Sequence, residues 1–271
     1  MTTNSLSLIH VLLHDALDQN LVLSYFPKNF HQLIKFSEDK FAEVSRGQFC
    51  SSNILVDHSP FLYFDSETLW LVGQDFVAMS IDLEEISKSI KIHQKGVDPL
   101  LRAIGAKERD LSVFDFTAGT LRDAIHMVKL GHCVSAFERH PVVFALLQNA
   151  LLRSSFNSLI QLRFGEAKNH SFEDSLRPDI VYFDPMFDGH ADKTAKSRKE
   201  MELFHQLFKS LPFSECEDDL SKHDEELNTL QFALSLAKKR VIVKRAPKAQ
   251  TLKTPTFQML TKAVRFDVYQ L

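Results

Sequence analysis

Cysteine is scarce in this chain, and the few cysteines form no pattern. The 271 residues include three, Cys50, Cys133 and Cys216, with no CxxC pair and no cluster of Cys and His. Wide spacing and an odd number argue against a disulfide framework or a zinc site, and are typical of a reducing cytoplasm. We therefore expect a cytoplasmic protein that needs no metal.

Long apolar runs and a surplus of basic residues are also missing. No run is long enough to cross a bilayer, and the N-terminus lacks the features of a signal peptide. Because 32 Lys and Arg face 35 Asp and Glu, the net charge is -3. No global basic field predicts a nucleic-acid partner, so local patches would have to provide one. We expect no membrane contact.

Residues 1–90 alternate apolar and polar positions and contain little that suggests chemistry. The first 50 residues are typical of mixed helix and strand, and short β-like runs follow at 53–56, 61–64, 68–72 and 76–81. We interpret residues 1–90 as a small N-terminal α+β region.

From about residue 111, short apolar runs alternate with amphipathic helical segments, which predicts βαβ units and a parallel sheet. The predicted strands are 112–116, 133–137, 160–164, 180–183 and 241–243, with a closing pair at 257–260 and 264–271. We therefore predict an α/β domain over residues 91–271 with about seven strands. Residues 187–224 form a long charged segment, and such insertions are usually functional or disordered.

Acidic and small residues follow the predicted strands at their carboxyl ends, where open α/β sheets bind ligands. Each alone has an ordinary explanation as a turn or a helix cap. Their occurrence in order favours a cofactor site, in which Glu138, 23 residues after Asp115, holds a ribose. The positions are Asp115, Thr117 and Gly119 after the first strand, Glu138 after the second, Glu166 and Ala167 after the third, and Asp184, Pro185, Met186 and Phe187 after the fourth.

The first loop distinguishes between two nucleotide cofactors. NAD sites use G-x-G-x-x-G, whereas residues 118–122 hold one glycine, Gly119. Such a loop suits a pyrophosphate poorly. S-adenosyl-L-methionine (SAM) has no phosphate, and its sulfonium and amino group suit carboxylates, so the acidic strand ends favour SAM.

Several motifs occur in the order found in a known family. The segments are 115–124 (DFTAGTLRDA), 138–143 (ERHPVV), 182–187 (YFDPMF), 199–201 (KEM), 239–245 (KRVIVKR) and 265–269 (RFDVY). From about residue 99 to the end, the chain resembles the RsmJ family of bacterial 16S ribosomal RNA guanine-N2 methyltransferases.

The resemblance implies a class I, Rossmann-like methyltransferase fold with a seven-stranded sheet, SAM as cofactor, and small-subunit ribosomal RNA or the assembled small subunit as partner. It implies cofactor contacts at Arg122, Asp123, Glu138, Arg139, Glu166, Ala167 and Asp184. One position departs from the family, because Leu121 stands where the first loop usually has its second glycine. We expect this leucine to narrow the cofactor pocket.

Methyl transfer to an exocyclic amine requires a hydrogen-bond acceptor for the amine N–H and an oriented attack. Asp184 and the carbonyl of Pro185 are the candidate acceptors. Phe187 would stack on the base, a contact worth roughly 1–3 kcal/mol. Nearby basic residues are usually a solvated face, but their position favours phosphate contacts by Lys193, Lys196, Arg198, Lys199, Lys244 and Arg245.

Two other functions fit the same residues. The Asp-Pro-Met-Phe tetrad also resembles that of amino-methylating enzymes in general, so DNA or a small molecule is an alternative substrate. A non-catalytic RNA-binding module that has lost the cofactor is the other alternative, and Leu121 is the residue that favours it.

Overall fold

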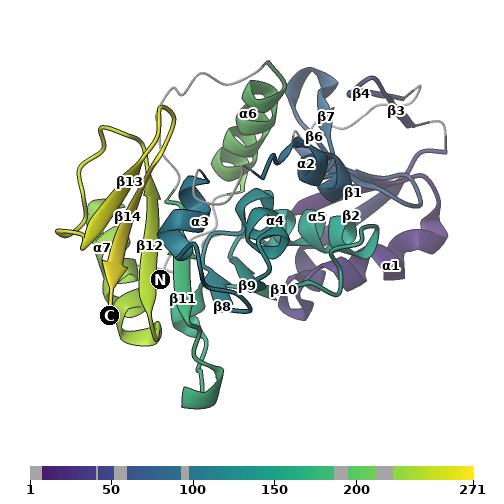
Figure 1. Cartoon of the computed structure of the whole chain (residues 1–271). Coiled ribbons are helices and arrows are strands. Elements are labelled where there is room, and N and C mark those ends of the chain that lie inside the picture. The colour runs from purple at the N-terminus through teal and green to yellow at the C-terminus, as the bar shows by residue number, and fades with distance from the viewer. Residues whose placement is uncertain (1–7, 41, 52–59, 93–97, 186–194, 212–221) are drawn as a thin grey trace. The chain divides into compact units, whose positions relative to one another are not determined.

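The computed structural model describes residues 8–40, 42–51, 60–92, 98–185, 195–211 and 222–271 (Figure 1). The chain forms two compact units. The first comprises residues 1–82, 140–153 and 192–215, and the second comprises residues 83–139, 154–191 and 216–271. The domain border at residues 90 and 91 stays a prediction.

The first unit contains a five-stranded mixed sheet with the order β2-β1-β5-β6-β7. β1 is parallel to β2 and β5, and the remaining neighbours are antiparallel. The strands are β1 (Ile9–Leu13), β2 (Ile34–Glu38), β5 (Phe61–Phe64), β6 (Leu69–Val72) and β7 (Ala78–Met79), beside the hairpin of β3 (Glu43–Ser45) and β4 (Gln48–Cys50). The small α+β region is thus confirmed.

Two of the short strands predicted in this region are confirmed, as β5 and β6. The strand predicted at 76–81 was too long, because a 3₁₀ helix over Gln74–Phe76 with positive φ at Asp75 and Phe76 interrupts it. The strand predicted at 53–56 lies outside the described residues.

Helices from distant parts of the chain complete the first unit. They are α1 (Gln19–Tyr25), α5 (Pro141–Leu152) and α6 (Ala195–Ser210), with 3₁₀ helices at Ala16–Asp18 and Lys28–Leu33. In α5, nine of twelve residues are buried. Its Asn149 donates to the Glu67 carbonyl at 2.9 Å and accepts from the Leu69 N–H at 3.0 Å. α6 lies in the segment 187–224, for which the sequence predicted no element.

The second unit contains the predicted seven-stranded sheet, with the order β10-β9-β8-β11-β12-β14-β13. The first five strands of this order are parallel, and β14 is antiparallel to both neighbours. Because β9 and β11 flank β8 on opposite sides, the switch point lies between β8 and β11. The strands are β8 (Ser112–Asp115), β9 (Cys133–Glu138), β10 (Ile160–Phe164), β11 (Ile180–Phe183), β12 (Arg240–Arg245), β13 (Phe257–Leu260) and β14 (Arg265–Gln270).

Helices cover both faces of this sheet. α7 (Lys222–Leu236) packs against alternate residues of β11 and β12, among them Val181, Phe183 and Val243. The other face carries α3 (Pro99–Ile104) and α4 (Arg122–Lys129), which Figure 1 shows on the side away from α7. α2 (Leu83–Ser89) packs on α4, and 3₁₀ helices follow at Ala167–Asn169 and Asp174–Leu176. The doubly wound α/β class is confirmed.

Candidate active site

The register of the parallel strands gathers polar side chains on the α4 face of the sheet. Tyr182 of β11 lies opposite Asp115 of β8, and Phe183 lies opposite Val243 of β12. One residue further on, Asp184 and Lys244 are therefore neighbours. Because side chains alternate between faces, Tyr182, Asp184 and Lys244 point to the face opposite α7.

Lys244 joins two carboxylates in this cluster. Its Nζ lies 2.7 Å from Asp184 Oδ2 and 2.7 Å from Asp123 Oδ2. Asp123 is in the first turn of α4, and it also accepts a hydrogen bond from the Tyr182 hydroxyl at 2.6 Å. The cluster thus links β11, β12 and α4 beside the switch point.

Thr117 connects the loops that follow β8 and β11. Asp115 Oδ1 accepts from the Thr117 N–H at 3.0 Å and from its hydroxyl at 3.3 Å. The Asp184 N–H donates to Thr117 Oγ1 at 2.8 Å. These contacts hold the backbone that carries the two candidate acceptors, which are the Asp184 carboxylate and the carbonyl of buried Pro185.

Three carboxylates lie close together here, and Lys244 contacts two of them, Asp123 and Asp184, which is reflected in the pKa values of all three. Burial raises the pKa of Asp115 to about 7, and the charges of Asp123 and Asp184 add to the rise. Burial raises the pKa of Asp184 to about 6, although Lys244 opposes the shift. Burial also acts on Asp123, but Lys244 and the Tyr182 hydroxyl outweigh it and lower the pKa of Asp123. The cluster carries surplus negative charge, which suits a cationic ligand such as a sulfonium.

Leu121 occupies a backbone conformation that favours glycine. Its φ is +61° and its ψ is 14°, directly before α4. The left-handed region costs an ordinary residue about 1–2 kcal/mol, which burial of the leucine side chain, 0% exposed, offsets. The expected narrowing of the cofactor pocket at this position stays a prediction.

The remaining predicted cofactor residues lie at the ends of β9 and β10. Glu138 is partly exposed at the end of β9, and its carbonyl accepts from the Gly165 N–H at 2.8 Å. The Glu166 carboxylate binds Arg139 at 2.8 Å and Lys168 at 2.7 Å. Burial raises the pKa of Glu166, but hydrogen bonds from these two cations outweigh it and lower that pKa. Glu138 and the Arg139–Glu166 pair thus border the same edge of the sheet.

The basic residues predicted to contact phosphate have varied surroundings. Lys244 is held by Asp123 and Asp184, while Arg245 is 7% exposed and pairs with Glu226. Both make carboxylate contacts in place of an open cationic face. Lys199 is exposed on α6. Phe187, Lys193 and the side chains of Lys196 and Arg198 lie outside the described residues.

Sequence reasoning did not identify Tyr182 as a member of the cluster, nor Lys244 as its central cation. A signal was present, because Tyr182 lies two residues before Asp184 and therefore on the same face of the strand. The pairing with Lys244 depends on the register of β11 against β12, which sequence alone does not determine.

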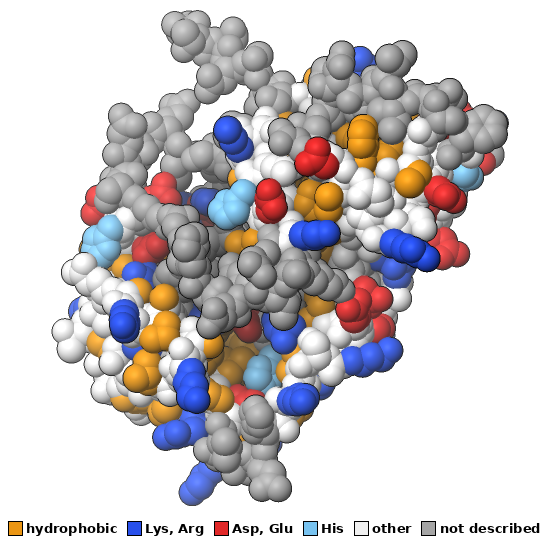
Figure 2. Space-filling view, turned by 90° about the horizontal axis from the view of Figure 1, so that it is seen from above, with side chains coloured by type: hydrophobic (Ala, Val, Ile, Leu, Met, Phe, Trp, Pro, Cys, Tyr) orange, Lys and Arg blue, Asp and Glu red, His pale blue; other side chains and the backbone are white. Residues whose placement is uncertain are grey.

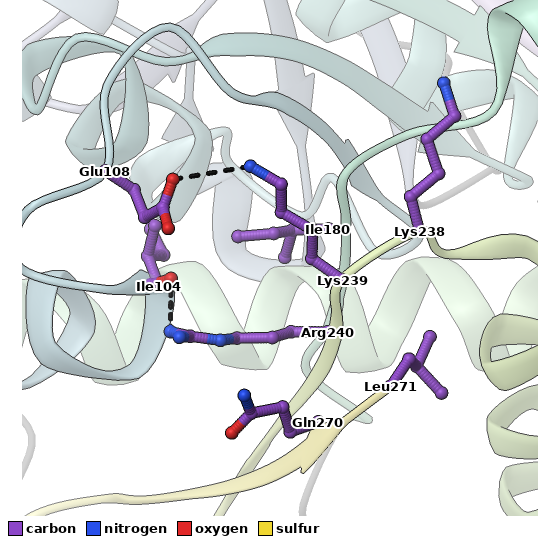
Figure 3. Close-up of a pocket in the computed structure, with 8 residues that line it drawn as sticks. All are labelled: Ile104, Glu108, Ile180, Lys238, Lys239, Arg240, Gln270 and Leu271. Carbon is purple, nitrogen blue, oxygen red and sulfur yellow. Dashed lines mark hydrogen bonds and ion pairs between the residues drawn. The ribbon is translucent and has the colours of Figure 1, made fainter.

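Among the described residues of the second unit, two cavities lie at opposite edges of the sheet. One, of about 360 Å³, is lined by residues that include Asp123 and Lys244 of the cluster. The other, of about 180 Å³, lies where β11 and β12 begin (Figure 3). In Figure 3, Lys239 reaches Glu108 and Arg240 reaches the Ile104 carbonyl, so their charged groups are already bound. Since such folds bind ligands at the carboxyl ends of the strands, the larger cavity is the candidate site.

Comparison with known proteins gives this site a context. A sequence model of the family described as "Putative SAM-dependent methyltransferase" matches residues 56–271. A relative from Neisseria meningitidis serogroup C (strain 053442), named ribosomal RNA small subunit methyltransferase J, is 31% identical over 230 residues, 80% of this chain and 84% of the relative. A relative of the same name from Thioalkalivibrio sulfidiphilus is 36% identical over 184 residues, 64% of this chain and 67% of the relative.

The chain belongs to the RsmJ family of SAM-dependent methyltransferases.

The fold of this methyltransferase agrees with a solved structure. A crystal structure of a SAM-dependent methyltransferase from Neisseria gonorrhoeae aligns with a TM-score of 0.66 at 24% identity, over 96% of this chain and 95% of that chain. The resemblance to the family and the Rossmann-like fold predicted from the sequence are thus confirmed, and SAM is the cofactor of the family. No helix in the described part of the methyltransferase is long and apolar enough to cross a membrane.

Proposed function

We propose that this methyltransferase acts in the cytoplasm and transfers a methyl group from SAM to the exocyclic N2 amine of a guanine in 16S ribosomal RNA. The relatives named above act, by their names, on small-subunit ribosomal RNA. The observation that carries the proposal is Asp184 at the end of β11. Its carboxylate contacts Lys244, its N–H donates to Thr117, and the rigid Pro185 follows it in the chain.

The residues of the cluster have separate tasks in this reaction. SAM supplies an electrophilic methyl group when bound. Asp184 accepts a hydrogen bond from the amine and orients its lone pair, and the Pro185 carbonyl provides a second acceptor. Asp184 need not remove a proton before the attack, because the amine becomes acidic only as the new bond forms. Lys244 keeps the carboxylate ionised and in place.

The surplus negative charge of the cluster fits the cationic sulfonium of the cofactor. We assign the adenosine part of SAM to the neighbouring strand ends. Glu138 accepts hydrogen bonds from the ribose hydroxyls, and Ala167 borders the adenine beside the Arg139–Glu166 pair. Asp115, Thr117 and Gly119 line the sulfonium side.

Replacing Glu138 by Ala tests this assignment. Loss of charged-acceptor hydrogen bonds should weaken binding of S-adenosylhomocysteine by about 1–3 kcal/mol, or roughly fivefold to 150-fold. Isothermal titration calorimetry measures the change. Glu173→Ala, at an exposed position after β10, should leave the affinity unaltered. An unchanged dissociation constant for Glu138→Ala would mean that Glu138 has only a structural role at the end of β9.

We assign contacts with the RNA backbone to the segment after Asp184. Figure 2 shows cationic and anionic side chains of the described residues interspersed on one face, so a strong basic field has to come from a local group of residues. Lys193, Lys196, Arg198 and Lys199 are such a group in the sequence.

Reversing the charges of Lys193, Lys196 and Arg198 together should raise the Michaelis constant for RNA and flatten its salt dependence, since fewer counterions are released. The affinity for S-adenosylhomocysteine should remain within about twofold, because no cofactor contact is lost. Reversal of Lys107 and Lys238, exposed at the opposite edge of the sheet, is the control. Unaltered RNA binding in the triple variant would make these residues a solvated face.

A methyl-transfer assay decides among the substrates. Tritiated SAM is incubated with unmodified small subunits, bare 16S RNA and DNA, and the products are digested to nucleosides. The proposal expects N2-methylguanosine from subunits or RNA. Methylated DNA bases would support the general amino-methylating alternative. Tight RNA binding without binding of S-adenosylhomocysteine would support the non-catalytic one.

A further inference from the structure

The last part of the chain is basic, although the protein as a whole is not. Residues 227–266 contain nine Lys and Arg and no Asp or Glu, whereas the net charge of the whole chain is -3. This segment runs from α7 through β12 and β13 into β14. Its cationic groups therefore have to find carboxylates elsewhere in the fold or remain available to a ligand.

Two of these cations are buried and hold the loop that follows β12. Arg245 donates to the Gln250 carbonyl at 3.0 Å, and Arg265 donates to the Pro247 carbonyl at 2.9 Å. Each guanidinium also pairs with a carboxylate. Leu252 of the same loop is buried in the core beside α7. The loop backbone is therefore held in place by charged donors and an apolar anchor.

Two other cations of the segment are exposed and lie in tight turns. A backbone hydrogen bond of 3.1 Å closes the turn 246–249, which contains Lys248. One of 2.8 Å closes the turn 261–264 between β13 and β14, which contains Lys262. Both side chains are exposed. Among the described residues, neither lysine has a carboxylate partner.

Both turns lie at the edge of the sheet that carries Asp184. The Lys248 turn directly follows β12, which is the neighbour of β11. The Lys262 turn is at the same edge, because Arg245 at the end of β12 lies opposite Arg265 at the start of β14. With strands about 5 Å apart, the two turns lie roughly 5 Å and 10–15 Å along the edge from the end of β11. A few nucleotides of RNA cover this span.

The charge of the active site makes cations beside it necessary for RNA. The cluster of Asp115, Asp123 and Asp184 carries surplus negative charge, which attracts a sulfonium but repels phosphates. A base can enter this site only if its backbone is held to one side of the carboxylates. Lys248 and Lys262 provide positive charge there, on turns that are already ordered, so binding costs little conformational entropy in the backbone.

We propose that Lys248 and Lys262 form a phosphate-binding edge that holds the RNA strand on the β12–β14 side of Asp184. The inference rests on the proposed function and deepens it, because it names the side of the cluster on which the strand lies. Arg245 is then a positioning residue, which fixes the loop that carries Lys248. Lys244 remains bound to its carboxylates and makes no phosphate contact.

Replacing Lys248 and Lys262 together by Gln tests this surface. The affinity for bare 16S RNA should fall roughly tenfold at about 0.1 M salt, and the log–log salt slope should become shallower by about 1.4–1.8, since two phosphate contacts are lost. Filter binding over a series of salt concentrations, with saturating S-adenosylhomocysteine, measures both quantities. Replacing both lysines by Arg should restore them, because the charge is retained.

The matched control removes the same charge from the same basic segment. Lys238 and Lys253 are both exposed. Lys238 lines the cavity where β12 begins, and the Lys253 carbonyl accepts from the hydroxyl of Tyr269, near the end of β14. Because β14 is antiparallel to β12, both lysines are placed toward the opposite edge of the sheet. The double replacement by Gln should therefore bind RNA as the native protein does.

Chemical acetylation of the native protein provides a second measurement. Bound RNA should protect Lys248 and Lys262 and leave Lys238 and Lys253 reactive, as mass spectrometry of the digested protein would show. This measurement needs no variant, so it does not depend on the folding of a substituted chain.

An unchanged salt slope in the Lys248 and Lys262 variant would overturn the inference, and so would an equal loss in the control, which would show that only total charge matters. In both cases the native protein still methylates RNA, and the proposed function stands. If the two lysines bind RNA but no guanine is methylated, the proposed function fails and the surface remains. If the native protein binds no RNA, both fail.

Discussion

Replacing Asp184 by Ala is expected to lower the single-turnover rate of RNA methylation by roughly a hundredfold, the effect of removing one positioned polar group. The carboxylate would no longer receive the amine N–H or orient its lone pair. The affinity for S-adenosylhomocysteine should fall less, since Asp184 is one of several groups near the cofactor. Rapid-quench measurement with saturating RNA and SAM separates the chemical step from binding.

Asp184→Asn is the sharper variant, because it keeps an acceptor oxygen without the charge. It should retain more activity than Asp184→Ala if hydrogen bonding is the role of the residue. Asp174→Ala, with a side chain that is 98% exposed, should behave as the native protein. Should Asn and Ala be equally inactive while both bind cofactor and RNA, proton removal or charge would be required, and our assignment would be incorrect.

Replacing Lys244 by Met should reduce both stability and activity at neutral pH. Two partly buried carboxylates, Asp123 and Asp184, would lose their shared cation, and leaving a buried charge unpaired costs roughly 3–5 kcal/mol. The stability gap to the native protein should narrow as pH falls, because protonated carboxylates need no cation. Urea unfolding at several pH values measures this gap.

The same variant should change the pH dependence of catalysis. Lys244 lowers the pKa of Asp184, which burial nevertheless raises to about 6. Without the lysine, that pKa rises further, so a larger fraction of Asp184 is protonated at pH 7. A protonated carboxyl group accepts the amine N–H less well, so the acidic limb of the single-turnover rate should move to higher pH.

Two further variants separate this effect from general destabilisation. Adding Asp123→Asn to Lys244→Met removes one unpaired charge and should recover part of the stability. Lys239→Met, at the opposite edge of the sheet in a pair with Glu108, should leave the pH profile unchanged. An acidic limb that stays in place in Lys244→Met would show that Lys244 does not act on Asp184.

Much of the second unit could be predicted because local sequence determines it. Apolar runs bounded by polar residues define the buried strands, and the 3.6-residue period defines α4. Asp115, Glu138, Glu166 and Asp184 could be placed at strand ends for the same reason, since a strand end is a local property. The region of residues 1–90 was harder, because its strands are short and the positive φ values at Asp75 and Phe76 have no clear local signal.

The sequence by itself determined the order of the strands in the second unit, the acids at the strand ends and the family motifs. Only the tertiary structure decided how those groups are used. Strand register brings Lys244 to Asp184, and the position of α4 on the sheet brings Asp123 to both Tyr182 and Lys244. Lys244 therefore holds two carboxylates, although its sequence neighbourhood suggested a phosphate contact. The sequence shows which side chains are charged, but it does not show which of them pair. Lys244 lies 60 positions from Asp184 and 121 positions from Asp123, and no local pattern specifies contacts over such separations.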